Sequence, residues 1–177
     1  PEKAKALLRE AGYAPGALKV KLTPLPPYFD LGEAIVTYWK AVGIDATMVV
    51  MERAAFIDSY AGKKLGGAVL AISGAMGNAA TRMEAYLMPG GTYSTMPAGT
   101  IPEIEDLWKK QATELDAKKR AEMLGRIQRI AYDRVTLPGI MDLAFLIGVG
   151  PRVEEPAIGL ISLFAYVGPF EDVRLKK

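Results

Sequence analysis

The sequence predicts an α/β fold in which βαβ units build a mostly parallel sheet flanked by helices. Three short apolar segments, residues 18–22, 46–51 and 68–72, have the composition of strands. Each is followed by a segment with helical spacing of apolar residues. Strands and helices that alternate at these lengths indicate right-handed crossovers and parallel strands. The continuous apolar run of 68–72 is typical of a fully buried strand.

Local signals place the other elements of the first part of the chain. A first helix is predicted over residues 1–11, and Gly12 suits the left-handed backbone that often ends a helix. The first strand should stop before residues 24–27, Pro-Leu-Pro-Pro, because proline cannot donate a hydrogen bond to a neighbouring strand. The clearest helical periodicity lies at residues 31–42, and a short third helix surrounds Phe56.

Two helices in the second half of the chain are predicted to form a hairpin. Thr100 and Glu103 have the spacing of a capping box at the start of the first helix. Asp116 is expected to cap the second, over residues 117–134. The apolar faces expected to pack together consist of Ile104, Leu107, Trp108 and Leu115 on the first helix and Met123, Leu124, Ile127, Ile130 and Ala131 on the second.

Composition limits the possible functions. The chain of 177 residues has no Cys and no His, which excludes disulfides and catalysis by Ser–His or Cys–His pairs within it. Its formal net charge is only +2 and its basic residues are dispersed, so no nucleic-acid partner is predicted. The most apolar stretch, residues 140–149, is shorter than the roughly 20 residues of a membrane-spanning helix. No signal peptide or initiator Met is present, so we expect a part of a longer protein.

A candidate binding surface lies where the predicted strands end. Ligands of open α/β sheets collect at the carboxyl ends of the strands, which places residues 23–30, 51–54 and 73–78 at one edge. The alternative for 73–78 is a plain turn whose glycines serve only the backbone conformation. After a predicted helix at 79–87, the Gly- and Pro-rich loop at 89–99 is long enough to suggest a function.

The final residues, 137–177, differ in character from the βαβ part. Apolar stretches at 137–149 and 158–167 surround a polar loop. Two arrangements remain open. The stretches either complete the predicted sheet as antiparallel strands or belong to another domain.

Five segments carry a resemblance to a known family. They are PEKAKALLREAGY at residues 1–13, VGID at 42–45, MERAAF at 51–56, DAKKR at 116–120 with RIQ at 126–128, and TLP at 136–138. In this order they resemble the C-terminal half of extracellular solute-binding proteins of family 5, the dipeptide-, oligopeptide- and nickel-binding group that serves ABC importers.

The resemblance implies one lobe of a two-lobed periplasmic-binding-protein fold. Such a receptor closes on a peptide or other small organic solute and delivers it to a membrane permease, without catalysis or cofactor. Residues 1–136 would form the second ligand-binding lobe, and residues 137–177 would return toward the first lobe, which lies outside this sequence. The implied partners are the ligand, the ABC permease and the missing N-terminal lobe, and the implied location is periplasmic.

The resemblance also identifies a departure at the candidate turn. In peptide-binding members, the strand that corresponds to residues 68–72 is followed by Gly-Trp-x-x-Asp, whose Asp takes the peptide's amino group and whose Trp lines a pocket. This chain has Gly74, but Ala75 replaces the Trp and Asn78 replaces the Asp. Because a neutral amide binds an ammonium group less strongly than a carboxylate does, a neutral, anionic or aromatic solute has to be considered beside a peptide. Nickel is less expected, because this half supplies no His.

The remaining site candidates follow the turn. The fork of Arg82 suits a ligand carboxylate, although a surface position would explain it equally. Asn78 could instead cap the following helix, and Met76 could belong to the core. The predicted ligand-binding residues are Gly74, Ala75, Met76, Gly77, Asn78, Arg82, Tyr93 and Met96.

Two other functions remain open. One is a periplasmic sensor of the same kind of ligand. The other is an enzyme with carboxylate acid–base chemistry, for which Glu52, Asp30 and Asp45 lie near predicted strand ends, although no pair is convincingly placed. The main prediction is a binding component with no catalytic residue, metal or cofactor.

Overall fold

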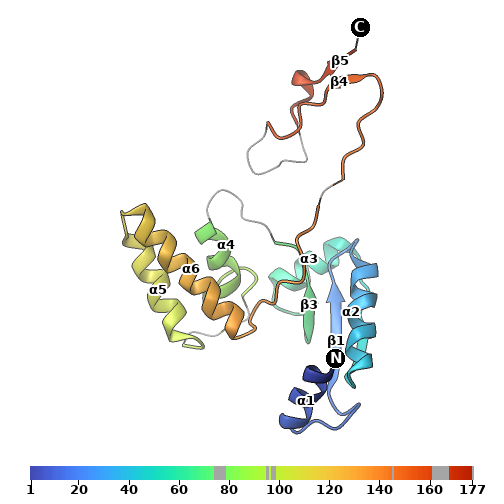
Figure 1. Ribbon diagram of the computed structural model, residues 1–177, viewed down its shortest axis with the longest axis vertical. Coiled ribbons are helices and arrows are strands. Elements are labelled where there is room, and N and C mark those ends of the chain that lie inside the picture. The colour runs from blue at the N-terminus through green and yellow to red at the C-terminus, as the bar shows by residue number, and fades with distance from the viewer. Residues whose placement is uncertain (74–78, 95, 97–98, 145, 161–167, 177) are drawn as a thin grey trace. The chain divides into compact units, whose positions relative to one another are not determined.

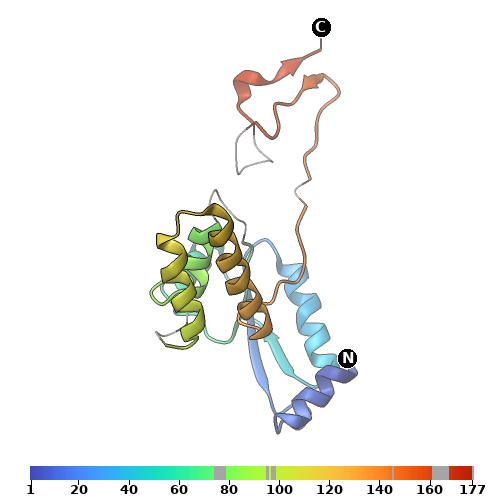
Figure 2. The ribbon, with the colours of Figure 1, turned by 60° about the vertical axis from the view of Figure 1, so that its left-hand side comes forward.

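The computed structural model describes residues 1–73, 79–94, 96, 99–144, 146–160 and 168–176. The chain forms two compact units, Pro1–Ser73 and Gly74–Lys177, and each is described by itself (Figures 1 and 2). Among the described residues, no helix combines the length and apolar character that crossing a membrane requires.

Helices and strands alternate along the first unit. They are α1 (Glu2–Glu10), β1 (Lys19–Pro24), α2 (Phe29–Ala41), β2 (Asp45–Met48), α3 (Arg53–Ala61) and β3 (Ala68–Leu70) (Figure 1). All strand pairs are parallel, and β1 lies between β2 and β3. Lys19 stands opposite Asp45 on one side of β1, and Leu22 stands opposite Ala68 on the other. The predicted α/β fold with a parallel sheet is therefore confirmed.

Strand β1 runs two residues further than its apolar alternation predicts, and it ends on a proline opposite Leu70. Successive residues of a strand direct their N–H groups to opposite neighbours. The N–H of Leu25 donates to the Leu70 carbonyl at 2.8 Å, so the nitrogen of Pro24 faces the β2 side. On that side β2 ends at Met48, so the proline lies where the pairing of β1 with β2 stops.

Strand β3 corrects the prediction of a fully buried strand. It spans only Ala68–Leu70, and of these residues Leu70 alone is buried. The physical reason is its place in the sheet, since β3 pairs with β1 and lies at an edge. Ile72, which the prediction included in the strand, lies beyond its end and is 38% exposed.

Helix α2 packs closely against the sheet. The buried core here consists of Leu22, Val36, Ala46 and Leu70. Gly32 faces the strand ends, where an added Cβ would lie 3.0 Å from the sulfur of Met48 and 3.1 Å from the ring of Pro24. The absence of a side chain at Gly32 therefore lets α2 approach the carboxyl ends of β1 and β2.

The second unit contains a cluster of helices, α4 (Ala79–Leu87), α5 (Pro102–Thr113) and α6 (Ala117–Asp133) (Figure 2). The predicted hairpin of the last two is confirmed, because α5 packs along α6. All three helices contribute to one buried core, together with Met88, the residue that follows α4. The core consists of Met83, Leu87, Met88, Ile104, Leu107, Ile127 and Ala131. The periodicity of α6 is confirmed as well, since Met123, Leu124 and Ile130 pack against this core.

The helix starts are partly as predicted. Asp116 caps α6, and its carboxylate accepts the N–H groups of Lys118 at 2.8 Å and Lys119 at 3.1 Å. The capping box at Thr100 is wrong, because Ile101 is the N-cap of α5 and proline occupies the first helical position. Proline suits that position, since the missing N–H would have no partner inside the helix.

The apolar face of α5 also needs a correction. Leu115 was expected in it but is 95% exposed, because the helix ends at Thr113. Gln111 takes the buried position instead and is 4% exposed. Its spacing of seven residues from Ile104 places it on the same side of the helix.

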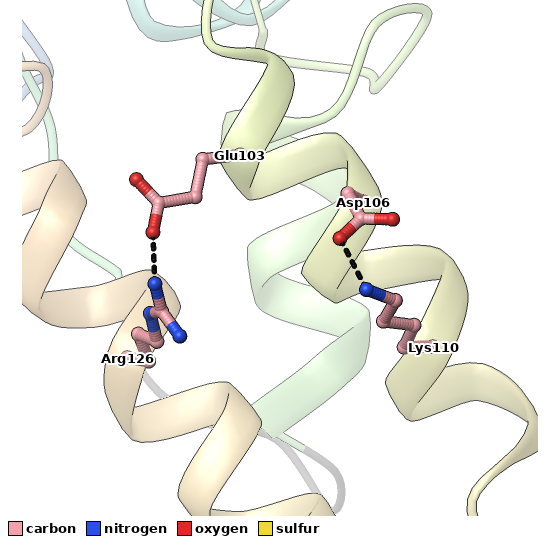
Figure 3. A network of polar contacts seen from close by, with 4 residues as sticks. All are labelled: Glu103, Asp106, Lys110 and Arg126. Atoms are coloured by element: carbon pink, nitrogen blue, oxygen red, sulfur yellow. Dashed lines mark hydrogen bonds and ion pairs between the residues drawn. The ribbon is translucent and has the colours of Figure 1, made fainter.

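Two ion pairs lie on the exposed side of the helical hairpin (Figure 3). Arg126 of α6 bonds Glu103 of α5, and Lys110 bonds Asp106 at 2.7 Å within α5. All four side chains are at least half exposed, so each pair should contribute no more than about 1 kcal/mol.

The end of the chain contains β4 (Val153–Glu155), the 3₁₀ helix η1 (Phe170–Asp172) and β5 (Arg174–Leu175). Strands β4 and β5 pair with each other in antiparallel fashion. Within the described parts of 137–177, no strand pairs with β1, β2 or β3. Residues 161–167 of the second apolar stretch lie outside the described residues, so the choice between the two arrangements stays open. The described residues of 137–150 form neither helix nor strand. The boundary at residue 136 stays a prediction.

Candidate functional site

The candidate edge of the first unit is held together up to the last residue of its strands. The N–H of Val49 donates to the carbonyl of Leu22 at 2.8 Å, just as Leu25 donates to Leu70. Beyond these bonds, the chain leaves the sheet at residues 26–28, 50–52 and 71–73. Because the strands are parallel, these three segments follow carboxyl ends at one edge, as predicted.

Two charged residues at this edge have structural roles. The carboxylate of Glu52 caps α3 by accepting the N–H of Ala54 at 2.7 Å. The guanidinium of Arg53 donates to the carbonyl oxygen of Pro26 at 2.6 Å. Glu52 and Arg53 therefore each bind backbone and form no ion pair with one another.

The three carboxylates considered for catalysis are not gathered at one place. Asp45 is the first residue of β2 and pairs with Lys19, the first residue of β1, so it lies at the amino end of the strands. Glu52 follows the opposite end of β2, and Asp30 lies in the first turn of α2. Asp45 is therefore separated from Glu52 by the length of β2, so these two carboxylates do not form a pair that could share acid and base roles.

Five of the predicted ligand-binding residues, Gly74, Ala75, Met76, Gly77 and Asn78, lie outside the described residues. The other three are described, and they lie in the second unit. Arg82 is half-buried on α4, while Tyr93 and Met96 belong to the loop that follows this helix. Their role in ligand binding stays a prediction.

The loop after α4 folds back on the helix. The N–H of Tyr93 donates to the carbonyl of Ala85 at 2.9 Å, and the rings of Tyr86 and Tyr93 lie 5.2 Å apart between centroids. Gly91 permits this return, since an added Cβ would collide with the carbonyl oxygen of Glu84. The position of Tyr93 is therefore fixed by its backbone and by its ring.

Met96 is placed by the core of the helical cluster. Its side chain is half-buried and packs against that core. Its N–H donates to the hydroxyl oxygen of Ser94 at 3.3 Å, and Ser94 is itself buried. Tyr93 is thus anchored to α4, and Met96 is anchored to the core that the helices of the second unit share.

Sequence reasoning missed a shallow groove between the end of α4 and α5. It has a volume of about 420 Å³ and combines apolar and charged groups. Its lining consists of Glu84, Met88, Pro89, Gly90, Gly91, Glu105, Trp108 and Lys109. The oxygen of Glu105 already accepts the N–H of Gly99 at 2.6 Å. The pattern at Trp108 indicated only a core position, so no signal in the sequence distinguished this groove.

Metal ligands are not grouped in the described part of the chain. No set of three or more Asp or Glu side chains there could hold an ion.

Comparisons with known proteins point to one class of fold. No family model and no curated protein matches the chain. Among solved structures, NikA from Brucella suis, solved in complex with Fe(III)-EDTA, matches 99% of this chain and 38% of its own, with a TM-score of 0.73 and 18% identity. CtaP from Listeria monocytogenes, an ABC transporter substrate binding protein, matches 76% of this chain and 28% of its own, with a TM-score of 0.63 and 23% identity.

A further match is DppA from Helicobacter pylori, an ABC transporter-associated periplasmic binding protein solved with the peptide STSA. It covers 76% of this chain and 27% of its own, with a TM-score of 0.59 and 23% identity. The chain thus spans between 27% and 38% of the length of these three proteins. Its α/β arrangement is the fold of one lobe of a substrate-binding protein, and the expected likeness to solute-binding proteins is confirmed at the level of the fold.

Proposed function

We propose that this chain is one ligand-binding lobe of the substrate-binding component of an ABC importer. The observation that carries the proposal is the agreement of the fold with NikA over 99% of the chain, together with the shared carboxyl edge of β1, β2 and β3. A lobe with such an edge can form one wall of a ligand cleft. The other wall would come from a first lobe outside this sequence.

The proposed ligand is a small organic solute or a peptide. DppA was solved with a peptide and NikA with an iron chelate, which illustrates the range of solutes that proteins of this fold accommodate. The proposed contacts are Arg82, Tyr93, Met96 and the turn at 74–78. Asn78 provides a neutral amide, which favours a ligand group other than a free ammonium.

Residues 137–177 are proposed to return toward the first lobe. Several of their described apolar side chains are exposed, among them Leu146 at 95% and Ile140 at 55%. A surface of this kind normally contacts another protein surface. The covering surface would be the first lobe of the same protein, in an extracytoplasmic receptor that delivers its ligand to a permease.

We propose a binding role without catalysis. Glu52 is occupied as a helix cap, and Asp45 lies at the opposite end of its strand, so these two of the three carboxylates considered for an enzyme do not act together. A sensor would use the same cleft, and its distinguishing feature would be a partner other than a permease.

A thermal-shift screen of the intact protein that contains this chain tests the proposal. The probes are the tetrapeptide STSA, Fe(III)-EDTA and Ni(L-His)₂, together with aromatic acids and sugars. A probe at about 100 times its dissociation constant adds roughly 2.7 kcal/mol to the free energy of unfolding, which is readily seen. A saturable shift with one class supports a receptor, whereas turnover of a probe would contradict a binding-only role.

A further inference from the structure

Arg53 connects two loops that are far apart in the sequence. Its Nη1 donates to the carbonyl oxygen of Pro26 at 2.6 Å, across 27 residues of chain. Pro26 lies in the β1–α2 turn, and Arg53 lies just after the β2–α3 turn. Because β1 and β2 are neighbours in the sheet, the bond braces two adjacent turns at the carboxyl edge.

The backbone of Arg53 is itself held in place. It is the first residue of α3, and the Glu52 carboxylate caps that helix through the N–H of Ala54. A hydrogen bond to an ionised carboxylate is charge-assisted, and such bonds are shorter and stronger than neutral ones. The guanidinium therefore extends from a capped helix start, which favours one direction for its side chain.

The turn that Arg53 contacts continues directly into a packed helix. The N–H of Tyr28 donates to the Leu25 carbonyl at 2.9 Å, and that of Phe29 donates to the Pro27 carbonyl at 2.8 Å. Tyr28 is half-buried against the core of the first unit, and Pro27 is exposed. The turn thus combines an anchored side and a side that faces solvent.

We propose that Arg53 is a positioning residue that fixes the β1–α2 turn as part of the ligand-facing wall. Its guanidinium holds the Pro26 carbonyl, so the exposed face of residues 26–28 keeps one orientation when a ligand arrives. The bracing of the turn is independent of any ligand. Its effect on affinity rests on the function proposed above.

Amide hydrogen exchange on this chain tests the bracing. In Arg53→Ala, exchange at Tyr28 and Phe29 is expected to rise about fivefold, because a hydrogen bond that holds their turn is lost. Arg53→Lys keeps a charged donor and should stay within about twofold of the wild type. Lys40→Ala is the matched control, because it removes an exposed positive charge from α2 in the same unit.

Two exchange results would overturn the role of Arg53. One is an unchanged rate at Tyr28 and Phe29 in Arg53→Ala. The other is an equal increase at Leu22 and Thr47 in the paired strands β1 and β2, which would indicate general destabilisation.

A second arm measures affinity of the intact protein for the tetrapeptide STSA, Fe(III)-EDTA and Ni(L-His)₂. With a probe that the wild type binds, Arg53→Ala should lose about tenfold in affinity, while Lys40→Ala loses none. Equal affinity of the two variants would overturn the effect on the ligand wall. If no probe binds the wild type, the proposed function is contradicted for these three solutes, while the exchange data still decide whether Arg53 braces the turn.

Discussion

Tyr93 is hydrogen-bonded to Ala85 through its N–H, at 2.9 Å from the carbonyl oxygen. This bond supplies a partner to a carbonyl near the end of α4, where the helix itself no longer provides one. The contact between the tilted rings of Tyr86 and Tyr93 adds a second attachment. A loop rich in glycine and proline is thereby fixed to a helix, and the proposed ligand contact at Tyr93 has a defined position.

Substitution of Gly91 should loosen this loop. In Gly91→Ala the new Cβ meets the backbone carbonyl of Glu84, so the loop must move, at a cost of about 1–3 kcal/mol in the free energy of unfolding. Gly125→Ala is the control, because open space surrounds that position on α6 and alanine favours a helix by up to about 1 kcal/mol. Urea denaturation followed by circular dichroism measures both. Equal stability of Gly91→Ala and wild type would contradict the packing of the loop.

Burial should decide the effect of apolar substitutions in the helical hairpin. Ile127→Ala removes a side chain that is 0% exposed, and about 2–5 kcal/mol of stability should be lost. Leu115→Ala alters a side chain that is 95% exposed and should change stability by no more than about 0.5 kcal/mol. Denaturant midpoints compare the two. Similar losses would mean that Leu115 packs after all.

Two carboxylates of the hairpin test the difference between a cap and a surface ion pair. Asp116→Ala removes the acceptor of two N–H groups at the start of α6 and should cost about 1 kcal/mol. Asp106→Ala breaks an exposed pair with Lys110 and should cost about 0.5 kcal/mol or less. Thermal unfolding of the two variants at low salt gives the comparison. The assignment of the cap fails if the Asp106 variant is the less stable one.

Asn78 provides a test of ligand specificity. Asn78→Asp would restore a carboxylate at the position that binds the amino group in peptide-binding members of the family this chain resembles. Because a charge-assisted hydrogen bond is roughly twice as strong as a neutral one, the affinity of the intact protein for STSA should rise about tenfold. Calorimetry with STSA and with its N-acetylated form separates the amino group from the rest of the peptide. An equal gain for both peptides would exclude Asn78 as the determinant of amine binding.

Periodic signals in the sequence predicted the fold well where local and tertiary preferences agree. Residues 31–42 and 117–134 carry apolar stripes, and helices α2 and α6 lie there, with Asp116 as a cap. These signals succeed because one helical face must be buried whatever the partner is. The alternation of strands and helices predicted the parallel sheet, because a helix that connects two neighbouring strands of one sheet crosses over and leaves the strands parallel.

The wrong predictions concern features that depend on tertiary neighbours or on where an element ends. An apolar run such as 68–72 cannot reveal whether its strand is central or at an edge, and β3 proved to be an edge strand. Leu115 fits the helical spacing, but the helix had already ended at Thr113. The bond between Arg53 and Pro26 joins loops 27 residues apart, and periodicity contains no information on such a contact.

The candidate site was only partly accessible to sequence reasoning. The edge of the sheet could be predicted from the topology, whereas the structural roles of Glu52 and Arg53 are seen only in the three-dimensional structure. The turn at 74–78 lies outside the described residues, so its part in binding remains a prediction.

Isothermal titration calorimetry tests the central proposal most directly. The probe that stabilises the intact protein in the thermal-shift screen is titrated into that protein and, separately, into residues 1–177. We expect saturable binding with one site by the intact protein and at least about a hundredfold weaker binding by the chain alone, because one wall of a two-sided cleft supplies only part of the contacts. Equally tight binding by residues 1–177 would contradict the account of this chain as one lobe of a two-lobed receptor.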